Sequence, residues 1–139
     1  MTAFEDFKIN IKLRLAALWT SLMFCYVYGD FFSLFVPGRI QGLMDGNSGA
    51  GETTPVMLLV YAVLLATPAL MIFFSVALKA RMNRLLNIIM GGFFTLVMIL
   101  VTATSLGEWM LFYTFLGIIE IILTCTIVWQ AVKWPTVKP

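Results

Sequence analysis

The sequence predicts an all-α integral membrane protein, a polytopic four-helix bundle. Of its 139 residues, 61% are hydrophobic and only 12% are charged, whereas soluble domains are about 45–50% apolar and about 25% charged. A soluble core of this size has too little interior to hide so much apolar surface. Four apolar segments are each long enough to cross a bilayer core, which takes about 20 helical residues. We therefore expect residues 1–139 to form a single membrane domain.

The spans are expected at about 15–36, 56–78, 88–106 and 109–131. Residues 37–55 are rich in Gly, Ser, Asn and Pro, a composition typical of a loop. This loop ends in Thr54 and Pro55, an N-cap followed by proline in the first helical turn. Pro68 is expected to kink the second span.

The other connections are predicted to be short. Residues 79–84 are interpreted as a basic turn, and only Gly107 and Glu108 separate the last two spans. So short a connection forces the last two spans into an antiparallel hairpin. Gly91 and Gly92 are expected to let the third span pack closely.

The segment before the first span is expected to form a short interfacial helix. Phe4, Phe7 and Ile11 fall on one helical face, and basic side chains nearby would lie among the lipid headgroups. The alternation of Ile9 and Leu13 with polar residues also fits a strand. No small-residue cleavage site follows the first span, so we do not expect a signal peptide.

Lys and Arg are distributed unevenly between the two ends of the predicted bundle. Eight of nine lie on one side of the spans, and only Arg39 lies on the other. The positive-inside rule predicts that both termini face the cytoplasm and that loop 37–55 faces outward. Trp19, Trp109 and Trp129 lie near predicted span ends and are expected to form an aromatic belt.

Composition disfavours several kinds of site. There is no histidine, the commonest metal ligand and general base. Cys25 and Cys125 are far apart and form no CxxC motif. We expect no metal, no cofactor and, with a net charge of +2, no nucleic acid partner. The two cysteines are interpreted as buried apolar residues, although a redox pair is an open alternative.

Two acids lie within spans, Glu120 near the middle of the fourth and Asp30 in the outer third of the first. A charge at the bilayer centre costs at least about 2.5–3.5 kcal/mol, so such residues are candidates for function. No span carries Lys or Arg away from its ends. Glu120 is therefore expected to be protonated, to bind a cation, or to hydrogen-bond to Tyr or Thr. Arg39 could fold back toward Asp30.

Each span carries one polar stripe at helical spacing, and the four stripes are expected to converge. With the spans antiparallel, the polar groups gather in the middle and outer half, which predicts a pocket that opens outward above an apolar inner half. The candidate ligand- or proton-binding residues are Glu120, Asp30, Tyr26, Tyr61, Tyr113, Thr124, Thr102, Ser105 and Glu108. The alternative is that the hydroxyls only join helices, through hydrogen bonds worth about 0.6–2 kcal/mol each.

Three segments carry a resemblance: WTSLMFCYVYGDFF, TPALMIFFSVALKARMNRLLNII and EWMLFYTFLGIIEIILTCTIVWQAVKWP. They resemble an uncharacterised family of bacterial four-helix membrane proteins, often from Bacteroidetes, known only as a domain of unknown function. The resemblance covers nearly the whole chain. It implies the fold, the topology and a location in a bacterial inner (cytoplasmic) membrane, but no activity. A looser analogy is to DoxX-like proteins. Small multidrug transporters also have four helices and one buried Glu, but theirs lies in the first span.

These observations favour a membrane-embedded binding or accessory protein with a polar pocket around Glu120 and Asp30. A proton- or cation-coupled transporter of small molecules is the main alternative. An enzyme acting on lipid or quinone is disfavoured by the lack of histidine and of a nucleophile–base pair. The expected partners are the lipid bilayer and a second copy of the chain or another membrane protein.

Overall fold

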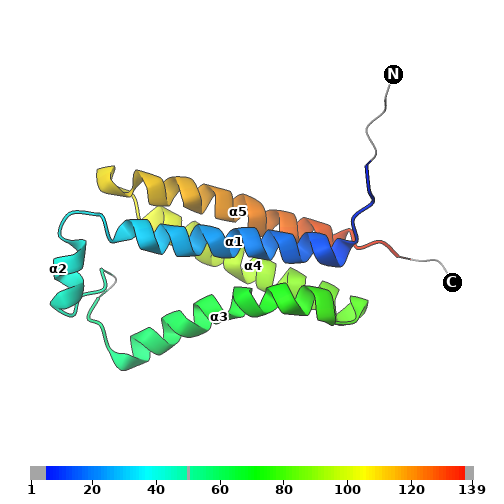
Figure 1. Ribbon diagram of the computed structural model, residues 1–139, viewed down its shortest axis with the longest axis horizontal. Coiled ribbons are helices and arrows are strands. Elements are labelled where there is room, and N and C mark those ends of the chain that lie inside the picture. Colours follow the sequence, from blue (N-terminus) through cyan, green and yellow to red (C-terminus); the bar gives the residue numbers. More distant parts are fainter. Residues whose placement is uncertain (1–5, 50, 137–139) are drawn as a thin grey trace, which may run out of the picture.

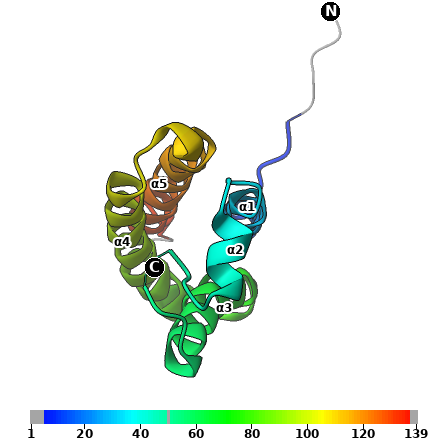
Figure 2. The same ribbon diagram turned by 90° about the vertical axis from the view of Figure 1, so that its left-hand side faces the viewer.

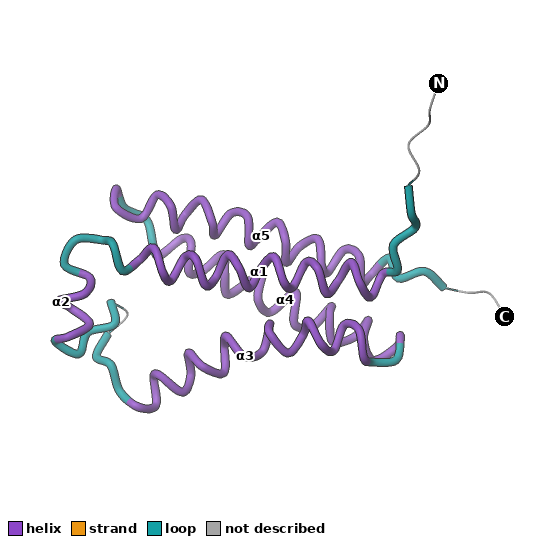
Figure 3. Tube along the Cα trace, viewed as in Figure 1, coloured by secondary structure: helices purple, strands orange, loops and turns teal. Residues whose placement is uncertain are grey.

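The computed structural model describes residues 6–49 and 51–136, and its regular secondary structure is helical (Figure 3). The four long helices are α1 (Ile11–Ser33), α3 (Pro55–Ala77), α4 (Ala80–Thr104) and α5 (Leu111–Val132). Each is long and apolar enough to cross a membrane, with the last span including the short 3-10 helix η1 (Glu108–Met110). The prediction of an all-α protein with four such helices is confirmed.

The long helices form a bundle in which consecutive long helices lie next to one another and α1 also packs against α5, the last helix of the chain. α4 and α5 lie side by side as a hairpin, and α1 packs against both α5 and α3 (Figure 1). Viewed along its long axis, the bundle is a ring of α5, α4, α3 and α1 (Figure 2). α3 touches α4 much less than α1 does α5.

The two ends of the bundle differ in charge. At one end α1 begins, α3 ends, α4 begins and α5 ends (Figure 1). We call it the basic end, because it carries Lys8, Lys12, Arg14, Lys79, Arg81, Arg84 and Lys133. We call the opposite end the loop end; it holds η1 and residues 34–54 with the short helix α2 (Arg39–Met44). Residues 37–55 are predicted as a loop, and within them the structure has the short helix α2, which follows Gly38 in the left-handed conformation (φ 77°).

Helix starts follow local capping. The Thr54 hydroxyl accepts the Met57 N–H at 3.2 Å, and Pro55 opens α3 as predicted. The Asn10 side chain accepts the Lys12 N–H at 2.9 Å and starts α1 at Ile11. The expected interfacial helix is therefore absent from residues 6–10, and the rest of that prediction, in residues 1–5, lies outside the described part.

The turn between α3 and α4 is shorter than predicted. Only Leu78 and Lys79 separate the helices, because residues 80–87 are already helical. Two cations at this end hold helix C-termini, where backbone carbonyls lack intrahelical partners. The Lys12 ammonium donates to Leu78 O at 2.6 Å, and Arg84 Nε donates to Ala131 O at 3.2 Å.

A chain of hydrogen bonds crosses the bundle near the basic end. Trp19 Nε1 donates to Asn87 Oδ1 at 2.7 Å, Asn87 Nδ2 donates to Asn83 Oδ1 at 2.7 Å, and Asn83 Nδ2 donates to Ser75 O at 2.5 Å. All four residues are fully buried. The predictions of an apolar inner half and of a belt position for Trp19 are wrong, whereas Trp109 and Trp129 are exposed.

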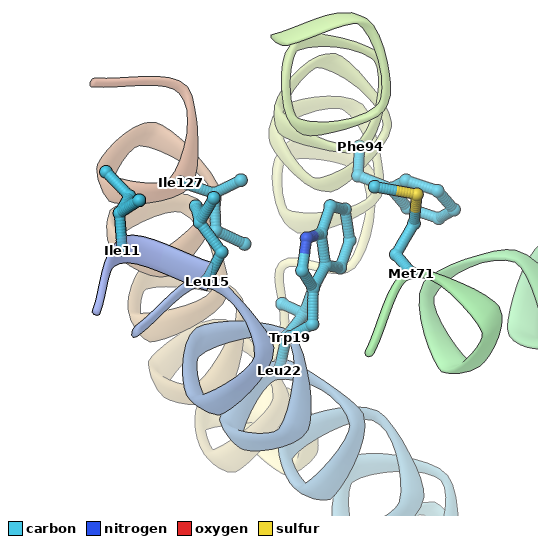
Figure 4. Packing of buried hydrophobic residues seen from close by; sticks show 7 residues of the cluster. All are labelled: Ile11, Leu15, Trp19, Leu22, Met71, Phe94 and Ile127. Carbon is cyan, nitrogen blue, oxygen red and sulfur yellow. The ribbon is translucent and has the colours of Figure 1, made fainter. Parts of the chain in front are cut away.

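Apolar packing surrounds this chain (Figure 4). The indole of Trp19 points from α1 toward Phe94 of α4 and Met71 of α3, and its ring meets Phe94 edge-on at 6.1 Å. The buried core consists of Ile11, Leu15, Trp19, Leu22, Met71, Phe94 and Ile127. Most of these residues lie in the half of the bundle nearer the basic end, which is therefore the well-packed half.

The first half of α3 diverges from the bundle toward the loop end (Figure 1). No residue of 55–67 is buried, and Pro68 is the first buried residue of the helix. Proline removes one backbone donor from the helix interior, and the buried part of α3 begins at this residue. The bundle is thus closed at the basic end and more open at the loop end.

Two glycines allow α4 and α5 to approach closely. A Cβ on Gly91 would lie 2.8 Å from Val128 Cγ2, and a Cβ on Gly117 would collide with Thr102 Oγ1. Small residues serve this purpose in membrane helix pairs generally. The prediction of close packing is confirmed for Gly91 and wrong for Gly92, which has open space around its Cα.

Asn87→Ala should lower the free energy of unfolding by about 2–4 kcal/mol, because the buried Trp19 N–H and the Asn83 amide each lose a partner. Denaturation in mixed micelles would measure the loss. Ser21→Ala, which removes an exposed hydroxyl bonded only to Ala17 O, is the matched control. Equal stability of the two variants would contradict a structural role for the chain.

Gly117→Ala should destabilise the protein by roughly 1–3 kcal/mol, since the new methyl group overpacks the contact with Thr102. Combining it with Thr102→Ala, which removes the colliding hydroxyl, should restore part of the loss. The four-variant cycle is measured by thermal unfolding in detergent. Additive effects would show that the two positions are not in contact.

Candidate functional site

Glu120 lies on the buried face of α5. It is 4% exposed and is the one buried ionisable side chain in residues 6–49 and 51–136. Gly117 and Thr124, one turn to either side, are also buried, so the predicted polar face of this helix does face the protein interior. The Thr124 hydroxyl donates to Glu120 O at 3.0 Å and to Ile121 O at 3.1 Å. It is therefore satisfied by its own helix.

Two hydroxyls from neighbouring helices are buried near Glu120 without a hydrogen-bond partner. They are Tyr26 on α1 and Thr102 on α4. Tyr26 is within electrostatic range of Glu120, and Thr102 contacts Gly117, one turn from Glu120. Three helices thus supply a carboxyl group and two unpaired hydroxyls to one region. We call Glu120, Tyr26, Thr102 and Tyr113 the Glu120 cluster.

Tyr113 links this cluster to the loop end. Its ring lies against Gly29, where a Cβ would be 3.6 Å from Tyr113 Cε2. Tyr113 is within electrostatic range of Glu120, Asp30 and Arg39. Asp30 itself is exposed rather than enclosed, and Arg39 of α2 acts on it electrostatically. The guanidinium of Arg39 also lies against Gly49, so α2 packs against the segment that follows it.

Three predicted site residues lie away from the cluster. Tyr61 is on the diverging half of α3, with its hydroxyl 3.4 Å from Ser48 Oγ. Ser105 is the C-cap of α4, and Glu108 is exposed at the start of η1. All three lie at the rim of the loop end.

The cysteines are both free. Cys25 is half-buried and within electrostatic range of Glu120, whereas Cys125 is exposed. The expectation that both are buried is therefore wrong for Cys125. No group of three His, Cys, Asp or Glu that could hold a metal occurs in the described ranges.

A cavity at the loop end is apolar. It measures about 370 Å³ and lies between the end of α1 and the start of α5. Its lining residues are Phe32, Phe35, Val36, Trp109 and Phe112, none of which belongs to the predicted site. The outward-opening polar pocket around Glu120 stays a prediction.

Phe94 connects the Glu120 cluster to the polar chain near the basic end, and we call Tyr26, Phe94 and Trp19 the aromatic layer. The ring of Phe94 lies 6.4 Å from that of Tyr26 on one side and 6.1 Å from that of Trp19 on the other. Beyond Trp19 begins the chain of buried asparagines. Sequence reasoning missed that chain, although Asn83 and Asn87 are spaced by one helical turn and continue at that spacing to the buried Gly91.

Comparison with known proteins identifies a family whose function is unknown. Residues 1–138 match the model of a family of unknown function, DUF6326. No curated protein and no solved structure matches the chain. The resemblance to a family of unknown function is thereby confirmed over the whole chain, and the chain belongs to the family DUF6326.

Proposed function

We propose that the protein is a membrane-embedded binding protein whose Glu120 cluster takes a lipophilic cation, with a protonated amine as the preferred chemical class. One observation carries the proposal. A carboxyl group that is 4% exposed shares the bundle interior with two buried hydroxyls that have no partner. The Tyr26 and Thr102 hydroxyls can therefore hydrogen-bond to a ligand without breaking a hydrogen bond within the protein.

Charge balance favours a cationic ligand. The lysines and arginines of the described residues lie at the basic end, apart from Arg39, which acts on Asp30 and Tyr113. A buried carboxylate without a counter-ion is costly, so Glu120 requires either a proton or a bound cation.

The hydroxyls favour a ligand that donates hydrogen bonds. A buried unsatisfied polar group costs about 1–3 kcal/mol, so an occupant that pairs with Tyr26 and Thr102 recovers that cost. An ammonium group has up to three donors and a positive charge. It can pair with the Glu120 carboxylate while it donates to the two hydroxyl oxygens.

The charge asymmetry supports the proposed orientation. With the basic end in the cytoplasm of a bacterial inner membrane, the Glu120 cluster is approached from outside, past Asp30, Tyr113 and Arg39. In the direction of the basic end, the rings of Phe94 and Trp19 follow that of Tyr26.

An accessory protein is the second candidate. The first half of α3 has no buried residue, which leaves an apolar helix surface for lipid or for another membrane protein. In that case the unpaired hydroxyls and Glu120 would only join helices or define assembly.

Glu120→Gln separates the two candidates, because it keeps the shape of the side chain and removes the charge. Binding of benzylammonium to the protein in nanodiscs, measured by calorimetry, should weaken by about tenfold or more, as expected for a charge-assisted hydrogen bond of about 1.5–3 kcal/mol. Tyr26→Phe and Thr102→Val should each weaken it several-fold. Benzyltrimethylammonium, which has no N–H donor, should bind less tightly than benzylammonium.

Thr126→Val is the matched control, since that hydroxyl bonds only to Ile122 O and is not in the cluster. Its affinity should equal that of the wild type. Unchanged binding by Glu120→Gln, or a change confined to stability and oligomeric state, would reject the binding site and favour the accessory protein.

A further inference from the structure

A groove lies at the basic end of the bundle, opposite the loop end that holds Asp30 and Arg39. It is an open groove of about 440 Å³ between the start of α1, the start of α4 and the segment after α5. Its lining residues are Lys8, Ile9, Asn10, Ile11, Lys12, Arg14, Ala80, Trp134 and Pro135. We call it the basic groove.

The cations of the basic groove are not equivalent. Lys12 is committed to the end of α3, where its ammonium donates to Leu78 O at 2.6 Å and to Val76 O at 3.3 Å. Lys8 and Arg14 are exposed. Two positive charges in one groove therefore remain for a ligand of opposite charge.

The remaining groove walls are apolar or present free backbone donors. Ile9, next to Lys8, is 56% exposed, and Trp134 packs partly against the core. Ala80 is the first residue of α4, whose N-cap Lys79 makes no side-chain cap hydrogen bond. The first backbone N–H groups of a helix point away from it unpaired and favour anions. The groove thus combines positive charge with an apolar rim.

We propose that the basic groove is a binding site for an anionic phospholipid. The headgroup phosphate lies between Lys8 and Arg14, near the start of α4, and the glycerol and first acyl carbons contact Ile9 and Trp134. Charge complementarity selects an anionic over a zwitterionic lipid, because a zwitterionic headgroup brings its own cation to the groove. A lipid fits better than soluble phosphate, because the groove lies at the end of helices long enough to span a membrane and has an exposed apolar wall.

The positive-inside rule accounts for basic residues at this end in general, but it does not distinguish one cation from another. A lipid site does, because it predicts that removing Lys8 and Arg14 weakens lipid binding more than removing cations outside the groove. Arg81 and Lys133 lie at the same end and do not line the groove. They provide a matched pair with the same total charge.

The test compares Lys8→Gln/Arg14→Gln with Arg81→Gln/Lys133→Gln in the full-length protein, purified from vesicles of equal phosphatidylglycerol and phosphatidylcholine. Native mass spectrometry counts the lipids that remain bound. The wild type and the Arg81/Lys133 variant should retain phosphatidylglycerol over phosphatidylcholine. The Lys8/Arg14 variant should lose this preference by about thirtyfold, the scale of two charges near a membrane surface at about 1 kcal/mol each. Circular dichroism checks that each variant is folded.

Equal losses in both variants would overturn the proposal, because they would indicate a general charge effect. So would a wild type with no preference between the two lipids. Competition by millimolar inorganic phosphate would show that the groove recognises phosphate from solution, and it would also reject a lipid site. These outcomes are independent of Glu120, so they do not depend on the function proposed above.

Discussion

The buried chain from Trp19 through Asn87 and Asn83 to Ser75 is the interaction on which the rest of the bundle depends. It joins α1, α4 and α3, three helices that a purely apolar interface would hold without fixing their rotation or depth. In a bilayer every buried polar group requires a protein partner, so each of these side chains admits few arrangements. Around this fixed chain Phe94, Met71 and Leu15 pack without exposure, and α5 completes the core through Ile127.

The two halves of the bundle satisfy that requirement differently. Near the basic end Trp19, Asn87 and Asn83 are buried and paired with one another, while Gln130 Oε1 is buried there without a partner. Lys12 and Arg84 cover the carbonyl ends of α3 and α5. Toward the loop end, Tyr26 and Thr102 are buried without partners, Glu120 has no cation in its part of the membrane, and the first half of α3 diverges. Two unpaired hydroxyls, a buried carboxyl group and looser packing therefore occur together toward the loop end, where a ligand would recover free energy by pairing with them.

The sequence was sufficient for the elements that depend on composition and local capping. Apolar length gave four helices, Thr54 and Pro55 gave the start of α3, and the spacing of Gly117, Glu120 and Thr124 gave the buried face of α5. It failed where tertiary contacts decide. Asn83 and Asn87 have a polar composition that suggests a turn, and only their partners on α1 and α3 make them core residues. Tyr61 and Asp30 have the correct helical phase, but the divergence of α3 and the exposure of α1 at Asp30 keep both outside the enclosed cluster.

The aromatic layer connects the Glu120 cluster to the buried polar chain near the basic end. Phe94 is held between Tyr26 and Trp19, and Trp19 is oriented by its hydrogen bond to Asn87. The Trp19–Asn87 hydrogen bond, which orients α1 against α4, thus also positions the aromatic layer next to the Glu120 cluster. The aromatic layer is held in place by the well-packed half of the bundle. A conformational change on ligand binding at Glu120 would therefore cost less free energy in the half with fewer buried contacts. The first half of α3 and the short helix α2 are therefore the parts of the bundle in which a conformational change on ligand binding would cost the least free energy.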